Sequence, residues 1–196
     1  MSYSILKLIH VIGAIVMGAG LFGVWLADLR GRQVEDLPRF SETVRNIRVF
    51  YDGLVLPGAL LILVSGTWMV VTTYGGWSFH FLEMPWLAGM AILFAFEFLE
   101  GNTITRIYFV RLGRLTEEAL RQGRFTEALV GARESTTPTF THFLDIPLYL
   151  TIVALGTTKP MTWTLFFASS SVAVAIALTV TVPRLFRWSP LEAQPA

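Results

Sequence analysis

Two glutamates interrupt an apolar run in the stretch AGMAILFAFEFLEGNTITRIYF. Glu97 and Glu100 are three residues apart, so a helix places both carboxyl groups on the same face. A charged group at mid-membrane costs at least about 2.5 kcal/mol on insertion scales, and such groups normally face the interior of a bundle and mark function. Two acids on one face can pass a proton between them, so the pair predicts proton transfer.

Depth along the helix distinguishes the two acids. If the run begins at Trp86, Glu97 lies near the bilayer centre and Glu100 about 9 Å from the cytoplasmic boundary. Asp145, in a later apolar run, reaches the depth of Glu100. Desolvation favours a neutral Glu97, or one that faces a water-filled cavity, whereas a nearby cation favours a charged Glu100. We therefore predict a proton relay of Glu97, Glu100 and Asp145 that leads toward the cytoplasm.

Other polar residues are expected at the same depth. Together with Glu100 and Asp145 they form one predicted polar cluster near the inner face: Asp52, Asn102, Arg106 and His142. A purely structural alternative stays open, in which Arg106 forms an ion pair with Glu100 or Asp145 and locks the bundle. Glu97 has no basic residue at its own depth in either interpretation.

A histidine in the first apolar run suggests a second kind of chemistry. His10 is expected about 9 Å below the outer surface, with Gly13 and Ala14 one turn deeper on its face. Small residues let another helix approach closely, and they would equally leave room for a flat macrocycle. Because neutral imidazole is a common ligand of haem iron, His10 and His80 are candidate ligands of haem b. The alternative for His10 is a hydrogen-bonded packing residue.

Five apolar blocks must position these residues. The chain is 54% hydrophobic and 15% charged, whereas soluble domains carry about 25% charged residues. Each block has roughly 17 to 25 residues, enough to cross about 30 Å of hydrocarbon as a helix. The blocks are residues 4–27, 49–73, 86–110, 140–156 and 161–182. We predict an all-α, polytopic membrane helix bundle with five transmembrane helices, a single domain over residues 1–188 and a short tail at 189–196.

The arginines predict the orientation of the bundle. All of them fall in segments 28–48 and 106–138 or in the tail at Arg184 and Arg187, on one side of a five-span threading. The other side has only Lys7 and Lys159. By the positive-inside rule the N-terminus is outside and the C-terminus inside, in a bacterial inner membrane. Residues 111–138 then form a cytoplasmic loop, in which Thr116 and Thr126 are expected to cap two amphipathic surface helices.

Several other chemistries have no support in the sequence. The chain has no cysteine, which excludes disulfides and thiolate ligands. It has no glycine-rich nucleotide loop and no histidine pair at zinc spacing. The net charge of +1 gives no indication of a nucleic-acid partner. We predict no metal site and no nucleic acid, and expect the lipid bilayer as a partner together with a homo-oligomer or a membrane complex.

Three short segments carry a resemblance to known families: LKLIHVIGAIVMGAGLF, LPGALLILVSGTWMV and the TKP turn at residues 158–160. Over most of the chain they resemble a family of small bacterial predicted integral membrane proteins of unknown function. The first span and the turn more weakly resemble HemJ-type protoporphyrinogen oxidases and copper-resistance D membrane proteins. The HemJ resemblance implies an axial haem role for His10. In the third span, where HemJ proteins have an important lysine, this chain has Glu97 and Glu100.

Three functions stay open from the sequence. The first is a b-haem redox or electron-transfer protein whose intramembrane acids conduct protons. The second is a proton- or ion-coupled transporter in which Glu97, Glu100 and Asp145 titrate. The third is a non-catalytic subunit or scaffold of a larger membrane complex, bound through its arginine-rich loops and small-residue faces.

Overall fold

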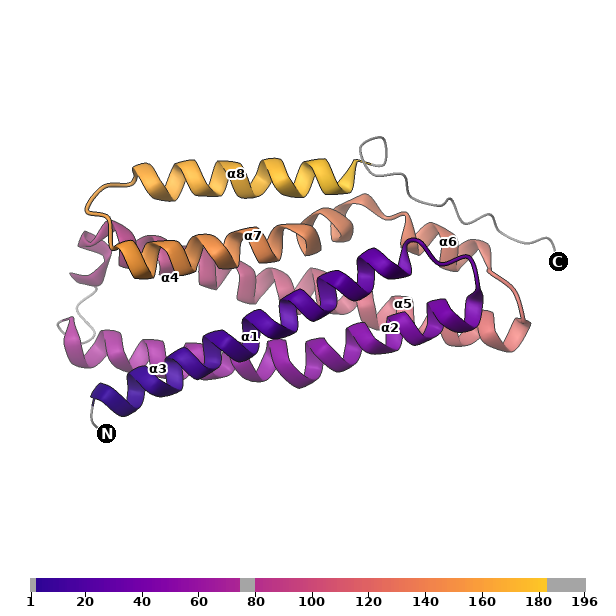
Figure 1. Ribbon diagram of the computed structural model, residues 1–196, viewed down its shortest axis with the longest axis horizontal. Helices are drawn as coiled ribbons and strands as arrows, with labels where there is room; N and C mark the ends of the chain where they lie inside the picture. Colours follow the sequence, from indigo (N-terminus) through magenta and orange to yellow (C-terminus); the bar gives the residue numbers. More distant parts are fainter. Residues whose placement is uncertain (1–2, 75–79, 183–196) are drawn as a thin grey trace.

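The computed structural model describes residues 3–74 and 80–182, and every element in these ranges is helical (Figure 1). Five continuous helical segments are long and apolar enough to cross a membrane, which confirms the predicted all-α bundle of five spans. The elements are α1 (Tyr3–Gly31), α2 (Leu37–Phe50), η1 (Tyr51–Val55), α3 (Leu56–Thr73), η2 (His80–Glu83), α4 (Pro85–Glu100), η3 (Gly101–Thr105), α5 (Arg106–Gln122), α6 (Glu127–Arg133), α7 (Thr136–Thr158) and α8 (Thr164–Thr181).

Two of the spans belong to helical rods that are longer than a membrane is thick. Residues 37–73 and 85–122 form continuous helices of 37 and 38 residues. Each is about 55 Å long at 1.5 Å per residue, against about 30 Å of hydrocarbon. The second and third predicted spans therefore continue as helix beyond the apolar blocks, because α2 and α5 are amphipathic and bury their apolar faces against each other.

The extended ends form a small helical cap, which we define as α2, α5 and α6, at one end of the bundle (Figure 1). Its core is apolar and continuous with that of the bundle. The buried side chains include Phe40, Val44, Ile47, Phe109, Leu112, Phe125 and Leu129. Residues 111–122 are thus the end of a rod and not part of a loop.

The two predicted helix caps have different outcomes. Thr126 accepts a hydrogen bond from the Leu129 amide at 3.3 Å and caps α6, as predicted. The prediction for Thr116 is wrong: it lies inside α5, where its buried hydroxyl donates to the Leu112 carbonyl at 2.7 Å. The third span does not break before this residue, so no helix begins there.

Glycines determine how closely α1 and α3 approach each other. A Cβ added at Gly58 would lie 2.5 Å from the backbone nitrogen of Met17, and one at Gly13 would lie 2.9 Å from Leu61 Cβ. Small residues in transmembrane helices serve such close contacts. The small-residue face of the first span therefore packs directly against α3.

The remaining spans complete the bundle. α7 is the most buried span, and α8 lies along its outer side (Figure 1). Ala173 and Ala177 of α8 belong to one apolar cluster with Phe143 and Leu155 of α7. Large apolar side chains such as Ile15, Val64 and Phe167 are exposed on the outer surface. In a multi-pass membrane protein these surfaces contact lipid.

Each long rod contains one π-helical turn, and the two turns face each other. In η1 the Leu56 amide donates to the Tyr51 carbonyl, and in η3 the Arg106 amide donates to the Gly101 carbonyl. The Tyr51 hydroxyl also donates to the Gly101 carbonyl at 2.6 Å and so joins the turns. Pro57 follows η1, and since a proline within a helix cannot donate and clashes with the preceding turn, a local π turn relieves the strain.

The orientation across the membrane stays a prediction, as does the division into one domain and a tail. Arg184, Arg187 and the tail at 189–196 lie outside the described residues, as do residues 75–79 between the second and third predicted spans.

Candidate functional site

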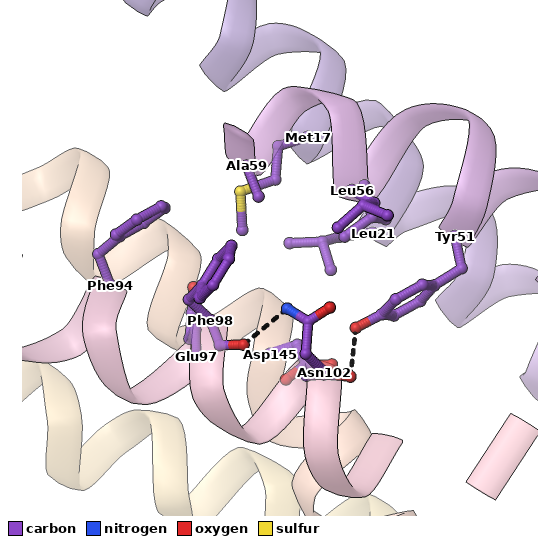
Figure 2. Close-up of a pocket in the computed structure, with 12 residues that line it drawn as sticks. Met17, Leu21, Tyr51, Leu56, Ala59, Phe94, Glu97, Phe98, Asn102 and Asp145 are labelled. Carbon is purple, nitrogen blue, oxygen red and sulfur yellow. Dashed lines mark hydrogen bonds between the residues drawn. The ribbon is translucent and has the colours of Figure 1, made fainter. Parts of the chain in front are cut away.

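Three acids from two helices meet inside the bundle. Glu97 and Glu100 come from α4 and Asp145 from α7, and each residue is at most 7% exposed. Figure 2 shows Glu97, Asn102 and Asp145 around a cavity whose other walls are mostly apolar residues of α1, α3 and α4. About 20 Å³ of this cavity is accessible to water, which is room for about one water molecule.

Glu97 is the least satisfied member of the group. Both of its carboxyl oxygens are buried and have no hydrogen-bond partner among the described residues. No lysine or arginine lines the cavity beside it. A buried carboxyl group without a partner is costly, and the cavity provides the space for a water molecule that could bond to it. The prediction that Glu97 is neutral or faces a water-filled cavity stays a prediction.

Glu100 accepts a hydrogen bond from a hydroxyl group and lies near a second acid. The cation predicted beside it, Arg106, pairs with a different residue. The Thr105 hydroxyl donates to Glu100 Oε1 at 2.6 Å. The carboxyl groups of Glu100 and Asp145 are close enough to interact electrostatically. The Nε of Arg106 lies 3.3 Å from Asp52 Oδ1, in a half-exposed ion pair. Arg106 therefore forms its ion pair with Asp52. The structural alternative had placed that ion pair with Glu100 or Asp145.

His142 lies between two carboxyl groups that come from different helices. Its Nδ1 is 3.7 Å from Asp145 Oδ2 and its Nε2 is 3.9 Å from Asp28 Oδ2. The residue is 2% exposed, and neither ring nitrogen has a hydrogen-bond partner among residues 3–74 and 80–182. The rings of Phe109 and Phe143 flank the imidazole at centroid distances of 5.1 Å. These nitrogen–oxygen distances exceed hydrogen-bond length, and a shift of less than 1 Å would close either gap.

Asp28 connects the imidazole to buried arginines near the cap. Arg32 Nε donates to Asp28 Oδ2 at 2.8 Å, and its Nη2 donates to the Thr139 hydroxyl at 3.0 Å. Arg133 Nη2 donates to the Gly31 carbonyl at 3.2 Å. Burial, together with the neighbouring Arg32, lowers the pKa of Arg133 to about 10.

The result is a line of polar groups from the cavity to the cap, which we call the carboxyl–imidazole line: Glu97, Glu100, Asp145, His142 and Asp28 with Arg32. Of the predicted cluster, it contains Glu100, Asp145 and His142, while Asn102 lines the cavity and donates to the Phe98 carbonyl at 2.8 Å. Asp52 and Arg106 form a separate pair at the surface.

Asp28 and Arg32 were not among the predicted site residues. A signal for them existed, because an acid and a base four residues apart can pair on a helix. They stand at the end of the first apolar block, where charges ordinarily mark the edge of a span. Only the packing of α7 against α1 brings Asp28 to His142.

The two histidines predicted to bind haem lie in other surroundings. His10 is half-buried, with its Nδ1 3.1 Å from the Ser65 hydroxyl oxygen, and a Cβ added at Gly66 would lie 3.1 Å from its Cε1. His80 Nδ1 lies 3.1 Å from Glu83 Oε1 at the exposed η2 turn. The face of α1 around Gly13 is filled by α3. These residues do not fit a macrocycle beside His10 in this conformation, and haem binding stays a prediction.

No metal centre is evident in the part of the chain that the structure describes. Three or more histidine, aspartate or glutamate side chains nowhere gather there in a way that could hold a metal ion.

Comparison with known families gives one match. Residues 4–160 match the family described as "Predicted integral membrane protein (DUF2269)". Because the match covers most of the chain, the protein belongs to this family. The matched range contains four of the five spans and the whole carboxyl–imidazole line. The chain matches no curated protein and no solved structure.

Proposed function

We propose that this membrane protein conducts protons along the carboxyl–imidazole line, between the cavity at Glu97 and the cap at Asp28. The observation that carries the proposal is the position of His142. Its imidazole is buried, neither ring nitrogen has a partner among the described residues, and each nitrogen faces a carboxyl group from a different direction. Histidine can accept a proton at one nitrogen and release it from the other.

The transfer has two balanced steps. A protonated Asp145 gives its proton to Nδ1 of a neutral His142 that carries hydrogen on Nε2, which leaves a carboxylate and an imidazolium. The imidazolium then gives the Nε2 proton to the carboxylate of Asp28. The imidazole is left with its hydrogen on Nδ1, and exchange of this proton for one on Nε2 restores the starting tautomer before the next transfer. Glu97 and Glu100 supply the next proton to Asp145, because neighbouring buried acids avoid ionising together.

The size of the cavity favours protons over a larger cargo. About 20 Å³ accessible to water holds about one water molecule and excludes an organic solute. Such a path serves a protein that conducts protons by itself or a subunit that supplies protons to a membrane complex. Transport of a larger substrate would require a wider conformation.

Proton flux into vesicles tests the proposal. The purified protein is reconstituted in liposomes that enclose a pH-sensitive dye, and a potassium gradient with valinomycin supplies the driving voltage. His142→Gln keeps the side chain polar but cannot relay a proton, so we expect the flux to fall at least about ten-fold. His80→Gln, at an exposed turn outside the line, is the matched control and should keep the wild-type flux.

A second variant tests the entry to the path. Glu97→Gln preserves shape and hydrogen-bonding capacity, so we expect a folded protein with little flux. Infrared spectroscopy should show a protonated-carboxyl band that disappears in Glu97→Gln and persists in Glu100→Gln. Wild-type flux in both His142→Gln and Glu97→Gln would leave the carboxyl–imidazole line with a purely structural role.

A further inference from the structure

A basic groove lies on the surface of the rod formed by α4, η3 and α5. We define the α5 groove by its lining residues, three arginines and three other side chains, with a volume of about 450 Å³. They are Asn102, Arg106, Ile107, Val110, Arg111 and Arg114. The carboxyl–imidazole line does not use any of the three arginines.

The groove lies at the level where a membrane changes from hydrocarbon to headgroups. Arg106 follows Pro85, the first residue of α4, by 21 positions, which is about 31 Å of helix and matches the hydrocarbon thickness of about 30 Å. At the opposite end of the span, the Lys159 ammonium lies over the Trp86 ring, an arrangement typical of a membrane interface. Arg111 and Arg114 then lie about 7 and 12 Å beyond the hydrocarbon edge, within and just outside the headgroup layer.

The positive charge of the groove is only partly neutralised. Arg106 has a carboxylate partner in Asp52 at 3.3 Å. Arg111 and Arg114 form no ion pair with any of the residues that the structure describes, and no acid lines the groove. Guanidinium groups in such a cluster match the geometry and charge of a phosphate group.

Apolar side chains share the same groove. Ile107 is 62% exposed and lies between the arginines along the helix, and Val110 is half-buried beside it. A ligand that fits both the basic and the apolar part of the groove has an anionic phosphate at the level of the arginines. It also has a hydrocarbon chain on the side of the membrane core. A soluble phosphate would leave the apolar part uncovered.

We propose that the α5 groove binds the headgroup of an anionic phospholipid, with the phosphate on Arg111 and Arg114 and an acyl chain against Ile107. Basic clusters at the end of a transmembrane helix attract anionic lipids. The lipid would complete the surface of the rod where the bundle meets the cap. This proposal does not depend on proton conduction, because the residues that carry it lie outside the carboxyl–imidazole line.

Lipid retention provides the test. The protein is reconstituted in phosphatidylcholine nanodiscs that contain one-tenth phosphatidylglycerol, then released into neutral detergent, and its bound lipids are counted by native mass spectrometry. We expect phosphatidylglycerol to be enriched roughly ten-fold over its share of the bilayer. In the double variant Arg111→Gln, Arg114→Gln this enrichment should disappear.

The control removes the same charge from another part of the cap. Arg39→Gln with Arg45→Gln changes two exposed arginines of α2 that do not line the groove, and it should keep the enrichment. Equal retention of both lipids by the wild type, or an equal loss in the two double variants, would overturn the proposal. Displacement of the lipid by millimolar inorganic phosphate would also overturn it, since it would identify a soluble anion as the ligand.

Discussion

Side chains such as His142 and Glu97 are costly for a protein to bury without partners. Each unsatisfied buried polar group costs about 1–3 kcal/mol, and four such atoms belong to these two residues. A bundle selected for stability alone would have apolar side chains at both positions. Their burial next to Asp145 and a water-sized cavity is the observation that supports the proposed proton transfer.

At the scale of the residue, the buried ion pair of Asp28 and Arg32 leads to a prediction about stability. Asp28→Asn removes the carboxylate partner of a buried guanidinium that lies 2.8 Å away. Because breaking one partner of a buried ion pair leaves an uncompensated charge, the free energy of unfolding should fall by about 3–5 kcal/mol. Denaturation in detergent, followed by circular dichroism, measures this loss.

Asp52→Asn is the matched control, since its pair with Arg106 is half-exposed. Exposed pairs contribute about 0.2–1 kcal/mol, so this variant should unfold close to the wild type. Similar losses of unfolding free energy in the two variants would contradict the assignment of Asp28 to the buried ion pair.

The geometry of the rod explains, at the scale of the element, why Arg106 does not pair with Glu100. Arg106 lies six residues beyond Glu100, so at about 100° per residue the two side chains point about 120° apart on a regular α-helix. The extra residue of η3 rotates Arg106 by about 100°, which leaves the two side chains still about 140° apart. Glu100 stays inside the bundle, and Arg106 pairs with Asp52 at the opposite turn, η1.

At the scale of the element, the close contact between α1 and α3 leads to a prediction about stability. Gly58→Ala would put a Cβ 2.5 Å from the Met17 nitrogen and 2.8 Å from its Cα. Backbone atoms cannot move aside as a flexible side chain can, so we expect a loss of about 1–3 kcal/mol in unfolding free energy. Gly53→Ala is the control, because a Cβ there would meet nothing within 4 Å. Equal stability of the two variants would show that α1 and α3 are less tightly packed than described.

The whole molecule combines a lipid-exposed bundle with a cap that extends beyond the membrane. Two rods, each about 55 Å long, run from the bundle into the cap. The carboxyl–imidazole line runs from the bundle toward the cap, and the α5 groove lies at the level where the two parts meet.

The absence of cysteine allows a direct test of orientation. Single cysteines replace Met161, which is 71% exposed before α8, and Arg39, whose side chain is 81% exposed in the cap. If the N-terminus is outside, a membrane-impermeant maleimide should label position 161 in intact cells and position 39 only after permeabilisation. The reverse labelling would invert the direction of the proposed proton path.

The sequence alone determined the helical class and the five spans, because these follow from the length and composition of apolar blocks. Its short motifs resembled the family to which the chain belongs. It also identified Glu97, Glu100, Asp145 and His142, since polar groups at membrane depth stand out locally. Only the tertiary structure decided which of them meet. Asp28 reaches His142 through the packing of α7 on α1, and Arg106 leaves the cluster because it pairs with Asp52 of the other rod. Neither effect is visible locally, since both depend on how one helix rotates and docks against another.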